Sequence, residues 1–112
     1  LHYLRGALFE NLIINEFIKR NFNRGDNRQP YFWQDNRGKE IDCLLENGER
    51  ITPVEIKSGK TLSMSFFDNL KYWRPLASLP ENQGYVVYGG DQSLQTSTGS
   101  LISWKDLDRI PD

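Results

Sequence analysis

Residues 39–57, KEIDCLLENGERITPVEIK, decide the fold. Two apolar runs flank the dipeptide Asn47-Gly48, and this arrangement is a strong short-range signal for a tight β-hairpin. We therefore predict antiparallel strands at Lys39–Glu46 and Ile51–Lys57, joined by a two-residue turn at Asn47-Gly48. The other elements are placed relative to this hairpin.

The register of the hairpin determines which side chains meet. The predicted turn pairs Glu46 with Glu49. Counting back along the strands, it sets Asp42 opposite Pro53, so that one face of the hairpin is apolar and the other is charged. The apolar face would hold Ile41, Cys43, Leu45, Val54 and Ile56, and the charged face Glu40, Asp42, Glu55 and Lys57. Carboxylates this close could hold one cation; the alternative is a charged face in contact with solvent.

A helical period marks Ala7–Phe22, ALFENLIINEFIKRNF, as the first helix. Glu10 lies in the middle of its apolar stripe, which consists of Ala7, Phe9, Ile13, Ile14, Phe17 and Ile18. An unpaired carboxylate on a packing face is strongly unfavourable, so Glu10 needs a partner. Two partners are open: an arginine or backbone donor, or a place beside the carboxylates of the hairpin.

The rest of the chain predicts one more helix and three more strands. Strands are expected at Tyr31–Gln34, Gly84–Tyr88 and Leu101–Trp104, and a helix at Ser65–Arg74, with Pro75 limiting its end. On that helix Phe66, Leu70 and Trp73 recur at helical spacing and should pack on the sheet. Lys71 and Arg74 are then ordinary surface charges; the alternative is that they line a nucleic-acid groove.

Composition indicates one domain, comprising residues 1–112, with 38% hydrophobic and 26% charged residues. Fourteen basic residues against fifteen acidic ones give a net charge of -1, so any contact with nucleic acid must be local. Cys43 is the only cysteine, which excludes an internal disulfide. No apolar run could span a membrane and no signal peptide is visible, so we expect a cytoplasmic protein. Because the chain enters a helix soon after Leu1, we expect it to be a piece of a longer protein.

These residues resemble a known superfamily. Glu10 on a first helix, Asp42, and Val54-Glu55-Ile56-Lys57 on the strand after a hairpin are similar to the PD-(D/E)xK nucleases. The segments GALFENLIINEF, YFWQDNRGKEIDCLL, PVEIKSGKT and GYVVYGG resemble more closely the domain of unknown function found at the C-terminal end of many prokaryotic AAA-type ATPases. The resemblance implies an α/β fold with a restriction-endonuclease-like α-β-β-β-α-β core, and a mixed sheet flanked by helices. It also implies an N-terminal ATPase region in the same chain as a partner.

The resemblance further implies roles for individual residues. Asp42 and Glu55 would bind Mg²⁺ or Mn²⁺, with the Ile56 carbonyl as a further ligand. Lys57 would orient or activate the attacking water, and Glu10 would be an auxiliary ligand or act through a water. Hard oxygen ligands of this kind suit Mg²⁺, which keeps several waters and makes them more acidic.

Two lysines are candidate contacts to nucleic acid. Lys60 follows the second hairpin strand closely and could meet a phosphate, although a solvated loop lysine is the simpler interpretation. Lys71 is the candidate on the second helix.

Two functions remain open. The first is a metal-dependent phosphodiesterase acting on nucleic acid, most plausibly a DNA endonuclease. The second is a noncatalytic module that docks partners or substrates of an attached ATPase.

Overall fold

The computed structural model describes residues 2–81 and 83–111. In chain order the elements are α1 (His2–Asn23), β1 (Tyr31–Gln34), β2 (Glu40–Asn47), β3 (Arg50–Lys57), the short 3-10 helix η1 (Met64–Phe67), α2 (Asp68–Leu76), β4 (Tyr85–Tyr88), β5 (Leu94–Thr96), β6 (Gly99–Ser103) and the short 3-10 helix η2 (Leu107–Arg109). The predicted α-β-β-β-α-β order is confirmed. The short strand β5 was not predicted from the sequence.

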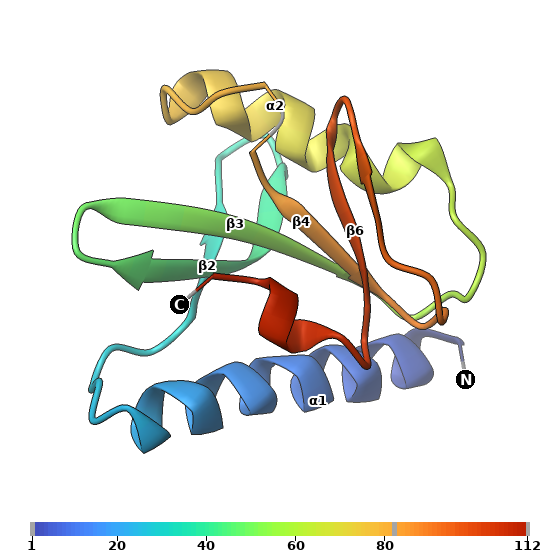
Figure 1. The fold of residues 1–112 in the computed structure, drawn as a ribbon. Helices are drawn as coiled ribbons and strands as arrows, with labels where there is room; N and C mark the ends of the chain where they lie inside the picture. The colour runs from blue at the N-terminus through green and yellow to red at the C-terminus, as the bar shows by residue number, and fades with distance from the viewer. Residues whose placement is uncertain (1, 82, 112) are drawn as a thin grey trace.

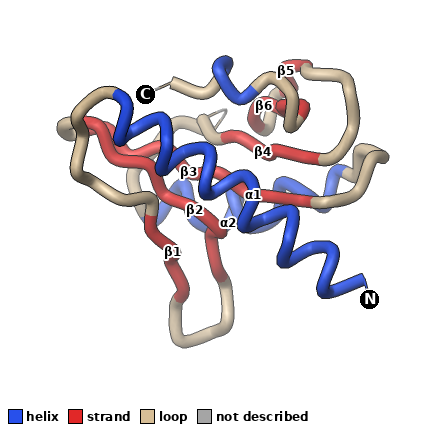
Figure 2. The backbone as a smooth tube through the Cα atoms, turned by 90° about the horizontal axis from the view of Figure 1, so that it is seen from below, coloured by secondary structure: helices blue, strands red, loops and turns tan. Residues whose placement is uncertain are grey.

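The elements form three layers, with the sheet in the middle. In Figure 1, α1 and η2 lie on one face of the sheet and α2 lies on the other. The strand order across the described residues is β1-β2-β3-β4-β6-β5. The central strands β3, β4 and β6 are parallel, whereas β1, β2 and β5 pair antiparallel with their neighbours. The mixed sheet flanked by helices is therefore confirmed, and Figure 2 shows α1 running across it.

The hairpin register differs from the prediction by two residues. Asn47 pairs with Arg50 and Glu46 with Ile51, so the loop is Gly48-Glu49 rather than Asn47-Gly48. The reason is that Gly48 has a φ of 63°, which glycine adopts freely, and type II′ turns use glycine at the first loop position. Because the shift is an even number of residues, it leaves side chains on their faces. Continued by one residue past Cys43 and Val54, the observed register sets Asp42 opposite Glu55 instead of Pro53.

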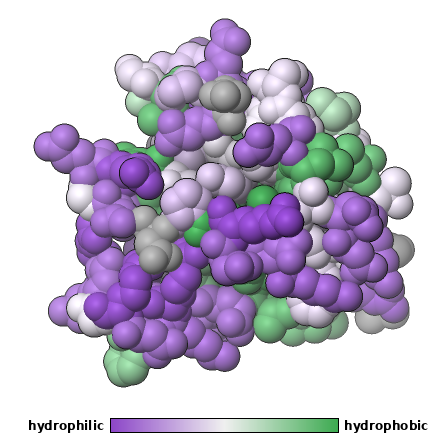
Figure 3. Space-filling view, viewed as in Figure 1, coloured by the Kyte–Doolittle hydropathy of each residue, from purple (hydrophilic) through white to green (hydrophobic). Residues whose placement is uncertain are grey.

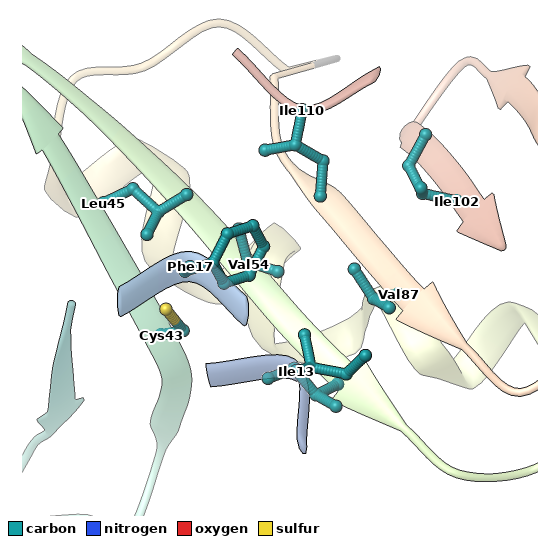
Figure 4. Close-up of a cluster of buried hydrophobic side chains, with 9 residues drawn as sticks. Ile13, Phe17, Cys43, Leu45, Val54, Val87, Ile102 and Ile110 are labelled. Atoms are coloured by element: carbon teal, nitrogen blue, oxygen red, sulfur yellow. The ribbon is translucent and has the colours of Figure 1, made fainter. Parts of the chain in front are cut away.

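Each face of the sheet carries its own hydrophobic cluster. Figure 4 shows the cluster beneath α1, where side chains from the helix meet side chains from four strands and from the C-terminal segment. It comprises Ile13, Phe17, Cys43, Leu45, Val54, Ile56, Val87, Ile102 and Ile110. The cluster beneath α2 comprises Ile41, Leu44, Phe67, Leu70, Trp73, Val86, Tyr88 and Leu101.

Ile41 belongs to the α2 cluster, so its predicted place on one face with Cys43 was wrong. The cause is an irregularity in the pairing of β1 with β2, where Tyr31 pairs with Leu44 but Trp33 pairs with Ile41. Such a bulge interrupts the alternation of side chains along a strand. As a result, β2 sends apolar side chains into both clusters.

The C-terminal segment closes the α1 face of the sheet. Ile110 is 1% exposed within the α1 cluster, and Arg20 of α1 donates hydrogen bonds to the Ile110 carbonyl at 2.7 Å and the Pro111 carbonyl at 3.2 Å. The first and last elements of the described chain therefore pack against each other. In those residues no helix is both long enough and apolar enough to cross a bilayer.

The outer surface is mostly hydrophilic. Figure 3 shows hydrophobic residues gathered in separate patches on the face that it presents. Part of the exposed hydrophobic surface belongs to α1, where Leu4, Leu8 and Leu12 are 47%, 61% and 45% exposed. These leucines follow one another at a spacing of four residues, which places them on one side of the helix.

Candidate functional site

Asp42 and Glu55 link β2 and β3 through their carboxylates. The backbone pairing of the two strands reaches Cys43 and Val54. At the next positions Glu55 Oε1 accepts a hydrogen bond from the Asp42 N–H at 2.9 Å, and Asp42 Oδ2 accepts one from the Ile56 N–H at 2.8 Å. Each carboxylate thus binds a backbone amide of the opposite strand, and the two acidic side chains are held close together.

Glu55 is the buried member of this pair. Its side chain is 1% exposed, and the Asn69 amide of α2 donates to Oε2 at 3.1 Å. The Lys57 ammonium lies 3.9 Å from the same oxygen, and its side chain is 35% exposed. Burial and the neighbouring Asp42 charge raise the pKa of Glu55 to about 7, against the lowering effect of its hydrogen bonds and of Lys57. The folded protein therefore favours the protonated form of Glu55 more than water does.

Glu10 faces these strands from α1. The group is half-buried; burial raises its pKa above the ordinary value, Asp42 and Glu40 raise it further, and Lys57 lowers it. The sequence left two kinds of partner open for Glu10. In the structure, Asp42 and Glu40 of β2 are close enough to influence its charge. In residues 2–81 and 83–111 no three His, Cys, Asp or Glu side chains are grouped as metal ligands. Glu10 is therefore not part of a three-carboxylate cluster with Asp42 and Glu55.

The loop after β3 brings Lys60 to the edge of the site. Gly89, which follows β4, donates from its N–H to the Gly59 carbonyl at 2.9 Å. A Cβ at Gly89 would lie 2.4 Å from the Ser58 carbonyl oxygen, so only glycine allows the loop to pack here. A cavity of about 230 Å³ opens beside this loop, lined by Phe9, Leu12, Ser58, Lys60, Gly89 and Trp104.

This cavity lies at the carboxyl ends of the parallel strands, next to α1. Lys57, Tyr88 and Ser103 are the last residues of the three parallel strands, and the cavity is lined by residues that follow directly after them. In open α/β sheets, ligands bind outside the carboxyl ends of parallel strands. Lys60 lines this cavity and stands three residues after Lys57, the last residue of β3.

Lys71, the other predicted contact, lines a different cavity, together with Arg74 and Glu81. The structure does not bring it together with Lys60. Arg74, expected on the surface, is buried at 3% exposure because its guanidinium donates to the carbonyls of Gln83 and Thr98.

Sequence reasoning missed Asn69. Its only signal was a polar residue beside the apolar positions of the second helix, and this pattern is common to many surface residues. Its contact with Glu55 depends on how α2 crosses the sheet, which the sequence alone does not specify.

Comparison with known proteins adds a family. The family model described as Domain of unknown function (DUF4143) matches residues 5–107. No curated protein and no solved structure matches the chain. The matched range contains the carboxylate pair, Glu10 and the loop that carries Lys60. The family description names no activity.

Proposed function

We propose that this chain, which belongs to the DUF4143 family, is a metal-dependent phosphodiesterase that acts on nucleic acid, with DNA as the expected substrate. One observation carries the proposal: the fold buries the carboxylate of Glu55 to 1% exposure and holds it beside Asp42. A buried carboxylate beside a second, half-buried carboxylate is expensive unless a cation joins them. Structural stability alone does not call for such a pair.

The donor set fits Mg²⁺ or Mn²⁺. Both are hard cations that bind oxygen, and Mg²⁺ is commonly held by one or two carboxylates while it keeps several waters. Asp42 and Glu55 would supply the carboxylates and the Ile56 carbonyl a further oxygen. Glu10, outside a direct three-carboxylate group, would act through a water. Structural zinc sites are mostly built from cysteine and histidine, and among the residues that the structure describes no His or Cys joins this pair in a group of metal ligands.

The side chains suit hydrolysis of a phosphodiester. A bound divalent ion would supply charge neutralisation and make water more acidic. Lys57, whose ammonium is 3.9 Å from Glu55 Oε2 and reaches solvent, would orient the attacking water and offset charge on the phosphate oxygens. Attack forms one bond to phosphorus and breaks the bond to the leaving oxygen, which takes up a proton from water. Asn69 would hold Glu55 in position through its hydrogen bond of 3.1 Å.

The neighbouring cavity could hold the part of the nucleic-acid strand that flanks the reacting phosphate. Lys60 would contact a phosphate, and Phe9 and Trp104 offer aromatic faces on which a base could stack. Lys71 lines a different cavity and is not part of this proposed contact surface. The net charge of -1 means that binding depends on these local groups and not on a broad basic surface.

The test is cleavage of linear and branched DNA in Mg²⁺ or Mn²⁺, with the purified chain and with Asp42→Asn, Glu55→Gln and Lys57→Met. Each of these variants should lower the cleavage rate by at least about 100-fold, because each changes a group at the reacting phosphate. Glu49→Gln removes an exposed carboxylate from the same hairpin and should cleave like the unmodified chain. Cleavage that survives Asp42→Asn and Lys57→Met would place the activity elsewhere.

A second candidate is a noncatalytic docking module for an attached AAA-type ATPase. The row of Leu4, Leu8 and Leu12 on α1 favours it, because these three leucines are between 45% and 61% exposed. An apolar row of this kind is typical of a surface that another protein covers. Absence of cleavage with every DNA substrate, together with binding of the ATPase region that Leu8→Glu abolishes, would establish docking in place of catalysis.

A further inference from the structure

A second cavity lies at the other end of the parallel strands from the carboxylate pair. It has a volume of about 370 Å³, within the range of small-molecule sites, and Lys71, Arg74, Glu81 and Thr98 contribute to its lining. Gln83 and Thr98, whose carbonyls bind Arg74, precede the parallel strands β4 and β6. The cavity is therefore at the amino ends of these strands and separate from the proposed catalytic site.

Arg74 is the distinctive group of this cavity. It is 3% exposed, yet only one of its nitrogens is engaged: Nη1 donates to the carbonyl of Gln83 at 2.9 Å and to that of Thr98. Nε and Nη2 have no hydrogen-bond partner among the described residues. Neither nitrogen is fully enclosed by the described residues, so each keeps some solvent-accessible surface.

The charge of Arg74 is also uncompensated at short range. No Asp or Glu of residues 2–81 and 83–111 comes within ion-pair distance of its guanidinium. Glu81 acts on it only from further away and is itself exposed, whereas Lys71 adds a second cation to the same lining. A buried cation without an ionic partner is unfavourable, so an anion placed beside Arg74 would be stabilised.

A purely structural role explains only part of this arrangement. The hydrogen bonds by which Arg74 holds the segments at Gln83 and Thr98 are donated by Nη1 alone. The Nε and Nη2 edge of a guanidinium is the pair of parallel donors that binds two oxygens of a phosphate or carboxylate. Because the space beside it is larger than one ion needs, the ligand has room for a group attached to the oxyanion.

We propose that this cavity binds the phosphate group of a phosphate-bearing small molecule, held by Arg74 and Lys71. The proposal is independent of the activity proposed for Asp42 and Glu55. The same chemistry could recognise a backbone phosphate of nucleic acid, so the experiment separates the two sources.

The experiment measures binding by calorimetry in EDTA at constant ionic strength, so that no metal occupies the carboxylate pair. Three probes are titrated into the whole chain: inorganic phosphate, a nucleoside 5′-monophosphate and a short single-stranded DNA without a terminal phosphate. Phosphate and the monophosphate should bind, and the monophosphate should bind more tightly because its attached group fills more of the cavity. The DNA should bind more weakly than the monophosphate.

Charge variants test the assignment to this cavity. Lys71→Gln should weaken monophosphate binding by about threefold to tenfold, and Glu81→Gln should strengthen it by a similar factor, because each changes one charge beside the oxyanion. Arg74→Lys should weaken it further, with folding checked by circular dichroism; if this variant does not fold, the other two decide. Glu16→Gln removes an exposed carboxylate from α1, on the opposite face of the sheet from α2, and should bind like the unmodified chain.

Three results would overturn the proposal. They are an absence of binding by phosphate and monophosphate, an affinity that Lys71→Gln and Glu81→Gln leave unchanged, and tighter binding of DNA than of the monophosphate. The last result would assign the cavity to the nucleic-acid backbone.

Discussion

Glu55 holds its proton more tightly in the folded protein than in the unfolded chain. Its pKa rises from 4.5 to about 7, chiefly through burial and then through Asp42. The stability that it contributes is therefore fully present below about pH 4.5 and is lost as the pH rises through about 7. Without a metal, the ionised carboxylate should lower the free energy of unfolding at pH 8.

Glu55→Gln should remove this pH dependence. The glutamine keeps the size of the side chain, and Asn69 can turn its amide to match the new hydrogen-bond pattern. In EDTA the variant should equal the unmodified protein near pH 4.5 and exceed it at pH 8 by an amount on the order of a few kcal/mol. Urea unfolding across this range measures the difference. Equal stability of both proteins at pH 8 would show that Glu55 titrates normally.

Metal should offset most of the difference between the two proteins at pH 8. Mn²⁺ at about 100 times its dissociation constant stabilises a folded protein by about 2.7 kcal/mol. The unmodified chain should show this gain, and Glu55→Gln should not.

At the residue scale, the sequence predicted that Asp42 and Glu55 lie together, but not the hydrogen bonds that hold them. Asp42, Glu55 and Lys57 could be found because alternation along a strand is strict enough to bring charges from two strands together. The hydrogen bonds of these carboxylates to backbone amides could not be predicted, because they depend on where the backbone pairing between β2 and β3 ends. The burial of Arg74 was also hidden, because its partners are loop carbonyls that no sequence pattern marks.

The end of α2 provides a test at the scale of an element. Ser78 follows the C-cap residue Ala77 and has a φ of 56°, in the left-handed region that non-glycine residues adopt at a cost. Ser78→Gly should therefore raise the free energy of unfolding by about 0.5–1 kcal/mol. Ala77→Gly is the matched control, since Ala77 has a φ of −93° and glycine there should destabilise by a similar amount. Chemical denaturation of both variants gives the two signs.

Helix and strand types were predictable, but their ends were less so. The prediction ended the second helix at Arg74 because of Pro75, yet α2 continues to Leu76 with Pro75 inside its last turn. The hairpin turn moved by one position because both Asn47-Gly48 and Gly48-Glu49 place the glycine in the loop. The strand β5 has only three residues, too few for a period-2 pattern to stand out.

At the scale of the whole molecule, the C-terminal segment should matter for stability. Ile110 is 1% exposed beneath α1, so Ile110→Ala should cost about 2–5 kcal/mol. Leu94→Ala, at a residue that is 43% exposed, should change stability by no more than about 0.5 kcal/mol. Thermal and urea unfolding of the two variants measure the contrast. A loss below 1 kcal/mol for Ile110→Ala would mean that the segment is not part of the core.

The order of elements and the mixed sheet followed from the sequence because each element carries a clear local pattern. The packing of the C-terminal segment on α1 did not. It joins residues far apart in the chain through a single isoleucine and the carbonyls bound by Arg20, and neither leaves a periodic signal.

The distance along the chain between these partners also bears on synthesis. Arg20 and Ile110 are 90 residues apart, and ribosomes add about 5–20 residues per second. Synthesis of Ile110 therefore follows that of α1 by roughly 5 to 18 seconds. During this interval the apolar side of α1 lacks the contact with Ile110 that it has in the folded chain.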